Sequence, residues 1–239
     1  MIAAELRKLV TVRSTWLLLG VAQLVVVGGV SGLMMRRADA TSPAGQRGAI
    51  GHVGLVALFA LVLGIMAVAG EYRHRTITDT YLACPRRERV VLAKLVVAAG
   101  AGALFGVVAA GTALITTAVW LTTKDASLAT GSADLWRTVF GGIGWNVAFA
   151  ALGVGVGALL TNLIGAIAAA LAWFALVEGI VAQLLGDAGQ WLPFALGVAL
   201  EGAQSGGGPA PWQAAVALAG YAAAFVVAGV ATTVRRDVT

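Results

Sequence analysis

The sequence predicts an all-α, polytopic membrane protein with six transmembrane helices in a single domain, residues 1–239. Hydrophobic residues make up 59% of the chain and charged residues 11%, and the mean hydropathy is +0.90, whereas about a quarter of the residues in a soluble domain are charged. Six apolar runs reach the length of about 20 residues that crosses a bilayer. Of the 16 Lys and Arg residues, 11 fall on the side of the two termini. Because cationic loops are retained inside, we expect both termini in the cytoplasm.

The first 14 residues are predicted to form an interfacial helix, residues 1–14, because they are too few and too charged to cross the bilayer. Ile2 and Leu6 fall on one face of this helix, and Glu5 and Lys8 fall on another. A helix of this kind lies in the plane of the membrane surface with its apolar side toward the lipid.

The six spans follow from the apolar runs and the polar stretches between them. The third run is long enough to begin in solvent and to tilt. Only Thr161 and Asn162 separate the fourth span from the fifth, which predicts a tight helical hairpin. We place the spans at about residues 16–35, 51–70, 90–120, 138–160, 163–185 and 213–234.

Several spans carry small residues at the spacing that allows two helices to approach closely. In span four we expect the glycines to serve core packing, because no strand precedes them as a dinucleotide site would require. The glycines concerned are Gly28 and Gly32 in span one, Gly102 and Gly106 in span three, and Gly153, Gly155 and Gly157 in span four.

Two connections on the outer side differ in character. Residues 36–50 read as a polar loop that contains Pro43. Residues 186–212 are too polar and too rich in Gly and Pro for a span, yet they include an apolar piece of half that length, residues 191–200. A piece of this length is typical of a re-entrant or interfacial segment. We therefore expect a short outer re-entrant helical segment between spans five and six.

The most polar part of the chain, residues 71–94, lies between spans two and three and carries six Lys or Arg residues with three acids. This charge predicts a cytoplasmic loop. Thr76 and Asp79 have the spacing of a capping box, in which the hydroxyl caps the first turn and the acid reaches back to the cap amide. A short helix is therefore predicted from Thr76 to Ala83.

One face of this short helix is apolar. Ile77, Tyr81 and Cys84 recur at intervals of four and three residues, which is the pattern of an amphipathic helix. Pro85 is expected to end the helix and to open the next one. The segment is thus predicted to lie across the inner membrane surface.

The same segment resembles the loop between spans two and three in permease subunits of ABC transporters of the ABC-2 type. The chain departs from such loops at His74 and Arg75, because a glycine often precedes the threonine there. The residues that carry the resemblance form the pattern E-x-R-x-x-T-x5-L-x2-P-x-R-x6-K and are Glu71, Arg73, Thr76, Leu82, Pro85, Arg87 and Lys94.

The resemblance implies a permease subunit of an ATP-driven exporter that works by alternating access. It implies as partners two separate cytoplasmic ABC ATPase subunits and a second permease subunit, identical or paralogous, in the surrounding membrane lipid. Tyr81 and Leu82 would supply apolar anchors for the ATPase, and the arginines would supply charge at the rim. The expected ATPase-coupling residues are Arg73, Arg75, Thr76, Ile77, Asp79, Tyr81, Leu82, Arg86 and Arg87.

The resemblance also implies that spans two and five line the transport path. Glu178 lies roughly 22 Å along span five at 1.5 Å per residue, and a carboxylate at such depth usually faces the bundle or water. Its partner is expected to be Asn146, Trp145, a backbone carbonyl, its copy in a second subunit, or the substrate. For Asn146 alone, an interhelical hydrogen bond is the favoured explanation. The candidate path residues are Phe59, Met66, Asn146, Phe174, Glu178 and Val181.

Other chemistry is not indicated by the sequence. No lysine follows the glycine pattern of a phosphate-binding loop, so ATP hydrolysis is expected on a partner subunit. His52 and His74 are predicted on opposite sides of the membrane, and Cys84 is the single cysteine. We therefore expect no catalytic residue, no cofactor-binding residue and no metal ligand, and no nucleic-acid partner despite a net charge of +5.

Two alternatives remain open from the sequence. The chain could be a membrane immunity or scaffold protein that binds a partner and transports nothing. A secondary transporter is less favoured, because the halves show no inverted repeat. The sequence does not define the transported substrate, which could be a lipid, a peptide, a drug or a glycan intermediate.

Overall fold

The computed structural model describes residues 1–84, 86–203 and 207–235, and this part of the chain folds into helices and short connections. Six helical segments are long and apolar enough to cross a membrane, which confirms the predicted multi-pass, all-helical architecture. They are Arg13–Arg36, Pro43–Arg73, Arg87–Thr122, Ala133–Leu159, Leu163–Trp191 and Pro211–Thr233.

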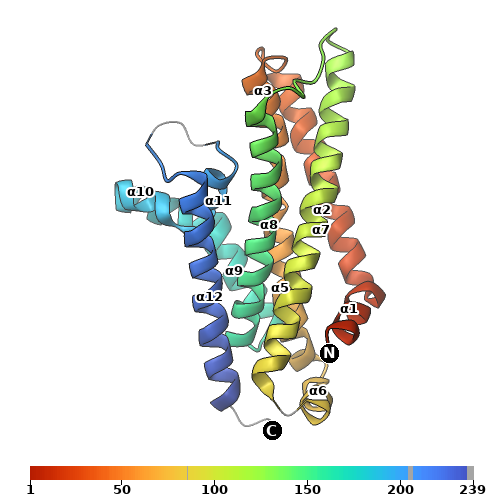
Figure 1. Ribbon diagram of the computed structural model, residues 1–239, viewed down its shortest axis with the longest axis vertical. Helices are drawn as coiled ribbons and strands as arrows, with labels where there is room; N and C mark the ends of the chain where they lie inside the picture. Colours follow the sequence, from red (N-terminus) through yellow and green to blue (C-terminus); the bar gives the residue numbers. More distant parts are fainter. Residues whose placement is uncertain (85, 204–206, 236–239) are drawn as a thin grey trace.

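The individual helices subdivide these segments (Figure 1). They are α1 (Ile2–Thr11), α2 (Arg13–Arg36), α3 (Pro43–Ile50), α4 (His52–Leu55), α5 (Ala57–Arg73), α6 (Ile77–Ala83), α7 (Arg87–Thr122), α8 (Ala133–Leu159), α9 (Leu163–Ala172), η1 (Trp173–Val177), α10 (Glu178–Leu185), η2 (Gly186–Trp191), α11 (Pro193–Leu200) and α12 (Pro211–Arg235).

The two ends of the bundle carry different parts of the chain. The proximal end, as we name it, holds α1, α6 and the first turns of α7 (Figure 1). The last turn of α12 lies there too, because Arg87 Nη1 donates a hydrogen bond to the carbonyl oxygen of Thr233 at 2.8 Å. The distal end holds α3 and residues 123–132, which the side chain of Gln46 joins by hydrogen bonds. The N-terminus and the 71–94 segment thus share one end, as the predicted topology requires.

Helix α8 runs through the centre of the bundle and packs against α5, α7 and α12. Gly153 of α8 and Gly64 of α5 face each other so closely that a Cβ on either would overlap the backbone of the other helix. A Cβ on Gly102 of α7 would lie 2.6 Å from the carbonyl oxygen of Asn146. Glycine therefore sets the distance between these helices, as predicted for spans three and four.

The small-residue face predicted in span one behaves differently. A Cβ on Gly28 or Gly32 would have no atom of the described chain within 4 Å. The pair therefore does not mediate helix packing inside this chain, although its spacing favoured such a role. Helix α2 instead contacts the rest of the bundle through a different stripe that includes Ala22, Val26 and Val30.

The first distal connection, residues 36–50, is not a simple loop as predicted. Its second half is helix α3, whose N-cap Ser42 accepts a hydrogen bond from the amide of Gly45 at 3.1 Å, with Pro43 in the first turn. A serine cap followed by proline is a helix start signal. The signal was present in the sequence, but the polar composition of the segment outweighed it in our interpretation.

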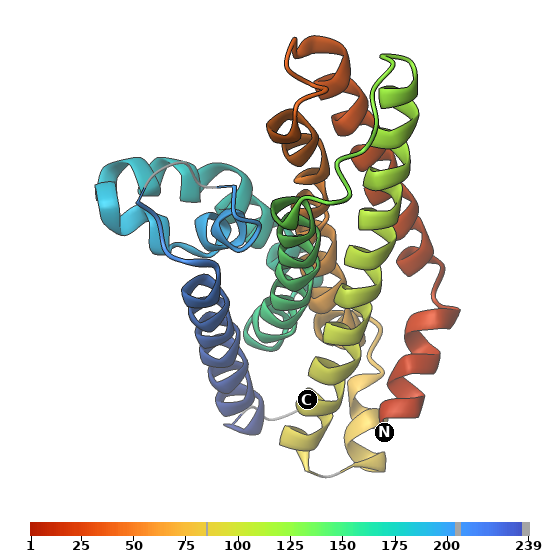
Figure 2. The ribbon, with the colours of Figure 1, turned by 45° about the horizontal axis from the view of Figure 1, so that its top comes forward.

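Span five is strongly bent. After α9, the π-helical turn η1 precedes α10, and α10 projects sideways from the bundle instead of continuing upward (Figure 2). The chain then returns through η2 and the short helix α11, which is the predicted half-length apolar segment. The connection from α11 to α12 passes through residues 204–206, which lie outside the described part. A π turn adds one residue to a helical turn, so the helical face predicted through Phe174 and Glu178 does not persist.

The predicted short helix is α6, but its predicted capping box is wrong. Thr76 is the N-cap residue, yet its side chain makes no capping hydrogen bond. The amide of Thr76 instead donates to the carbonyl oxygen of Glu71 at 3.0 Å, around Arg75 with φ of 57°. This left-handed residue occupies the position where similar loops often have glycine. Pro85, predicted to end the helix, lies outside the described residues.

The contact between α5 and α8 gives the first testable prediction. Gly153→Ala should destabilise the protein by about 1–3 kcal/mol, because the new methyl group must push two packed backbones apart. Gly28→Ala is the matched control, because its Cβ meets open space. Thermal unfolding of the purified protein in detergent measures both. An unchanged unfolding midpoint for Gly153→Ala would contradict the packing described here.

Candidate functional site

An ion-pair cluster at the proximal end joins three helices that are distant in the sequence. Lys94 Nζ donates hydrogen bonds to Glu5 Oε2 at 2.8 Å and to Glu71 Oε1 at 2.7 Å. Lys8 Nζ donates to Glu5 Oε1 at 2.9 Å and to Glu71 Oε1 at 2.6 Å. The four side chains carry two positive and two negative charges. We call Glu5, Lys8, Glu71 and Lys94 the proximal cluster.

Each helix brings its charge to the cluster in a different way. Lys94 lies two turns into α7 and its side chain is only 1% exposed, whereas Glu71 belongs to the last turn of α5. On α1 the polar side faces the bundle: Glu5 is buried, while Ile2 and Leu6 are each 53% exposed. This arrangement reverses that of a surface helix on a soluble protein, and it agrees with an apolar face turned toward lipid.

The cluster is electrostatically balanced. Burial alone would raise the pKa of Glu5, but the hydrogen bonds from Lys94 and Lys8 hold that pKa below its usual value. Burial alone would lower the pKa of Lys8, but Glu71 and Glu5 raise it. Both groups are therefore charged at neutral pH. Removing any one charge would leave an unpaired ion in a largely buried site.

Helix α6 is attached to this cluster and to the neighbouring helices through one face. The hydroxyl of Thr80 donates to Glu71 Oε2 at 3.2 Å, and Ile77 is buried. The hydroxyl of Tyr81 lies 3.3 Å from that of Tyr72, and the guanidinium carbon of Arg87 lies 5.0 Å from the centre of the Tyr81 ring. Burial raises the pKa of Tyr81.

The opposite face of α6 is open to solvent. Leu82 is 77% exposed, which is an unusual position for a large apolar side chain. The predicted coupling residues therefore divide into two groups. Ile77, Tyr81 and Arg87 contact this chain, whereas a second group projects outward: Arg73, Arg75, Thr76, Asp79, Leu82 and Arg86. Of the two predicted apolar anchors, Tyr81 is already in contact with Tyr72 and Arg87.

A cavity of about 440 Å³ opens beside the proximal cluster. It is lined by Glu71 and Lys94, by Met66 of α5 and by Leu163 at the start of α9. The lining thus combines charged groups with apolar side chains. Of the six candidate path residues, Met66 lines this cavity. The other five line neither this cavity nor the two described below, the apolar groove and the distal cavity.

Glu178 is buried, but its partners differ from those expected. Its Oε1 accepts hydrogen bonds from the amides of Phe194 and Ala195 at 2.5 and 3.4 Å. These amides belong to the first turn of α11, where unsatisfied N–H groups and the helix dipole favour an anion. Oε2 has no partner within the described chain. Glu178 therefore ties the corner of the bent span to α11.

Asn146 forms the predicted interhelical hydrogen bond. Its Nδ2 donates to the carbonyl oxygen of Val53 in α4 at 3.1 Å and to that of Gly142 at 2.8 Å. Phe174 packs on Phe149, with ring centroids 4.9 Å apart.

The candidate path residues do not converge on one surface within this chain. Phe59 packs with the core between α2 and α7, whereas Phe174 packs with the core around Trp145. Val181 is partly exposed on the projecting helix α10. Sequence reasoning placed Phe174, Glu178 and Val181 on one helical face, and the π turn η1 interrupts that face.

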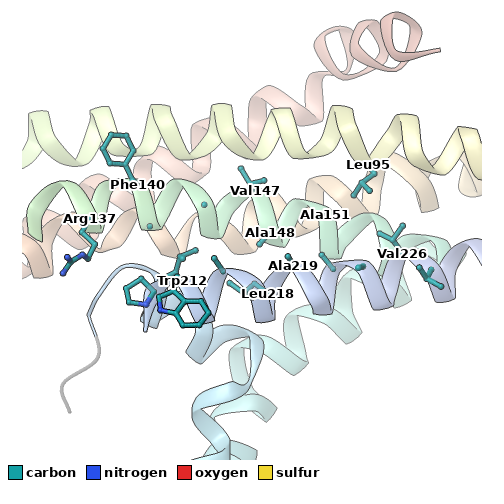
Figure 3. A pocket seen from close by; sticks show the side chains of 18 of the residues that line it. Leu95, Arg137, Phe140, Val147, Ala148, Ala151, Trp212, Leu218, Ala219 and Val226 are labelled. Carbon is teal, nitrogen blue, oxygen red and sulfur yellow. The ribbon is translucent and has the colours of Figure 1, made fainter. Parts of the chain in front are cut away.

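A long apolar groove of about 870 Å³ runs between α8 and α12 (Figure 3). Arg137 and Trp212 lie at its distal end, and Leu95 and Val226 lie toward the proximal end. Arg137, its one ionisable lining residue, already pairs with Asp134 at 3.2 Å. The side chains that line it are otherwise apolar or small, which suits contact with hydrocarbon.

The sequence interpretation missed several important residues. Glu5 and Lys94 were noted only as part of a helix face and of the loop pattern, and their pairing was not predicted. Glu201, which is 4% exposed at the end of α11, was not considered. A charged residue inside or directly after an apolar run is a usable signal, because burying a charge requires a compensating partner.

Comparisons with known proteins add no assignment. The chain matches no protein-family model, and no curated protein matches its sequence. Within residues 1–84, 86–203 and 207–235, no group of three or more His, Cys, Asp or Glu side chains is placed to hold a metal ion.

The proximal cluster gives the second prediction. Lys94→Met should destabilise the fold by about 3–5 kcal/mol, because it leaves a buried carboxylate without its counter-charge. Adding Glu5→Gln to Lys94→Met restores neutrality and should recover much of that loss. Thermal unfolding in detergent reports stability, and amide hydrogen exchange of residues 2–11 reports docking of α1.

Lys124→Met is the control for this pair, because Lys124 lies exposed in the turn after α7. It should leave stability and hydrogen exchange unchanged. A Lys94→Met protein as stable as the parent, with α1 equally protected, would contradict a structural role for the cluster.

Proposed function

We propose that this chain is the permease subunit of an ATP-driven exporter of the ABC-2 type, driven by a separate cytoplasmic ABC ATPase. The observation that carries the proposal is α6, a short helix at the proximal end that is fixed to the bundle on one side and bare on the other. Glu71 holds it through Thr80, and Leu82 stands exposed on the free side. A helix attached in this way can contact a partner through its exposed face and transmit the partner's movement to the bundle.

The proposed transmission runs through the proximal cluster. A movement of α6 acts on Glu71, and Glu71 is bound to Lys94 of α7 and to Lys8 of α1. The three elements therefore move together when the partner moves α6. Helix α1 would act as a second lever at the inner membrane surface.

The proximal end is proposed to be cytoplasmic. Of the 16 cations, 11 lie near the termini and in the 71–94 segment of the sequence. Those of the 11 that the structure describes lie at this end, and cationic loops are retained inside. Of the 11, Arg236 lies outside the described residues. Helices α3 and α11 would then lie on the outer side, and α11 would be the outer re-entrant segment.

A second permease subunit is proposed to complete the path. The bent span α9–η1–α10 leaves much apolar surface bare: Ile164, Leu176, Ile180 and Leu184 are each more than 60% exposed. Lipid and a second copy together would cover this surface. Alternating access would then occur between the two bundles, with Glu178 and Met66 as candidate contacts of the substrate. The substrate class is not defined by these groups.

The third prediction tests the partner. A photo-crosslinking amino acid at Leu82, in cells that contain the whole system, should give an adduct that mass spectrometry identifies as an ABC ATPase. The same label at Val119 is the control, because Val119 is 60% exposed on a spanning helix and should reach only membrane components. Leu82→Ala should weaken ATPase binding roughly tenfold, as expected for an exposed apolar anchor.

The alternative functions make different predictions for the same experiment. A scaffold or immunity protein would give an adduct with a partner that lacks ATPase motifs. A secondary transporter would give none at Leu82. Either result, with the chain properly inserted, would overturn the proposed coupling.

A further inference from the structure

A third cavity, of about 530 Å³, opens at the distal end between α3, α4, α8 and the turn after α11. We call it the distal cavity. None of the roles proposed above uses its residues. It combines two arginines with a carboxylate over a floor that contains two glycines, and the lining residues that matter are Arg37, Arg47, Gly48, Gly51, Thr138 and Glu201.

Glu201 is built into the wall of this cavity. It is 96% buried, since only 4% of its surface is exposed, and its Oε1 has no hydrogen-bond partner within the described chain. A Cβ on Gly142 would lie 2.8 Å from that oxygen, so glycine makes the space for the carboxylate. The hydroxyl of Thr138 donates to the backbone carbonyl oxygen of Glu201 at 3.0 Å and holds the turn in place.

Among the described residues, the two arginines of the cavity pair with Asp39 and Asp134 and leave this carboxylate without an ion-pair partner. Burial raises the pKa of Glu201 well above its usual value, and the nearby amide of Gly54 opposes this shift only in part. A buried carboxylate without a partner is costly, so the carboxyl group favours its protonated form, and a cation beside it would favour the ionised form. A cation that entered the cavity would therefore gain from contact with Glu201.

A positive group lines the same cavity. Nε and Nη2 of Arg37 donate to Asp39, each at 2.9 Å, while Nη1 lies 3.4 Å from the Cβ position of Gly48. Glu201 Oε2 lies 3.6 Å from the Cβ position of Gly51. Gly48 and Gly51 are three residues apart, which is roughly 4.5 Å along a helix. Opposite charges therefore flank one patch of glycine surface.

Tryptophan side chains place the cavity at a particular depth. Trp136, Trp191 and Trp212 are 40%, 42% and 69% exposed. Trp136 and Trp212 lie in the first turns of α8 and α12, and Trp191 ends η2 just before α11. Exposed tryptophans of this kind mark the membrane interface, at the level of lipid headgroups. Thr138 lies two residues beyond Trp136, roughly 3 Å along α8. The exposed apolar side chain of Leu55 lines the same cavity.

We propose that the distal cavity binds a zwitterionic headgroup in which a primary ammonium is joined by a short linker to a phosphate, as in phosphoethanolamine. The ammonium would contact Glu201 and the phosphate would contact Arg37 and Arg47. The headgroup would belong to a membrane phospholipid whose chains leave the cavity past Leu55. The same chemistry in a free solute would fit the charges but would not use that apolar exit. This inference requires only that the chain lies in a membrane, so it stands or falls apart from ATPase coupling.

The cavity distinguishes this headgroup from others. A primary ammonium can donate hydrogen bonds to the carboxylate, whereas a trimethylammonium cannot and is larger. A phosphoglycerol headgroup supplies the phosphate but leaves Glu201 without a counter-charge. Arg47 is available at the rim because its contact with Asp134, at 3.5 Å, is long and exposed.

The test uses the purified full chain in detergent with native mass spectrometry. Short-chain phosphatidylethanolamine should bind at least about tenfold more tightly than the matching phosphatidylcholine or phosphatidylglycerol. Glu201→Gln should abolish this preference with little change in the protein's shape. Glu88→Gln, an exposed carboxylate at the other end of the chain, is the charge control and should keep the preference.

A steric variant guards against misfolding. A Cβ on Gly51 would make only ordinary contacts, at 3.5 Å or more, so Gly51→Ala should fold normally yet place a methyl group between the two charges. It should lower phosphatidylethanolamine binding about tenfold, whereas Gly28→Ala should not. Equal binding of the three lipids, or a preference that survives both Glu201→Gln and Gly51→Ala, would overturn the proposal. Binding of free O-phosphoethanolamine without the lipid would overturn the membrane source alone.

Discussion

The buried ammonium of Lys94 is the constraint on which the proximal half of the structure depends. A charge that is 1% exposed requires opposite charges close by, and no carboxylate on α7 itself supplies them. Glu5 comes from the first helix and Glu71 from the end of α5, so neutralising one lysine fixes the positions of α1, α5 and α7. Thr80 extends the same connection to α6. The attachment of α6 to the bundle is thus a consequence of pairing the buried charge of Lys94.

In the distal half, buried polar side chains form hydrogen bonds with backbone groups instead of ion pairs. Glu178 accepts hydrogen bonds from two backbone amides at the start of α11. The side-chain amide of Asn146 joins α8 to α4. Unsatisfied oxygens nevertheless remain there, because Glu178 Oε2 and Glu201 Oε1 both lack a hydrogen-bond partner in the described chain. The two ends therefore differ in kind: the proximal cluster is internally balanced, whereas the distal cavity retains an unsatisfied carboxylate. A balanced cluster suits mechanical connection, and an unbalanced one suits a ligand.

Much of the fold could be predicted because hydrophobic length is a local property. The six spans and α1 follow from it, and α6 follows from the amphipathic spacing of Ile77 and Tyr81, although its predicted cap was wrong. The ends of the spans were predicted less accurately. Helix α8 begins at Ala133, five residues before the predicted start, because polar residues on a helix that leaves the membrane resemble a loop. The left-handed Arg75 and the bend at η1 also depend on neighbours that a single sequence does not reveal. The pairing of Glu5 with Lys94 spans 89 residues, so tertiary structure alone could identify it.

The central claim is that α1, α6 and the first turns of α7 move as one unit. The most direct measurement is the distance between two spin labels, one on the native Cys84 and one at Ala3, in the chain reconstituted with its ATPase. The distance should be the same in the nucleotide-free and ATP-bound states, while the distance from Cys84 to a label at Leu184, on the projecting helix α10, should change. A Cys84–Ala3 distance that shifts by about 5 Å, one helical turn, would contradict the account.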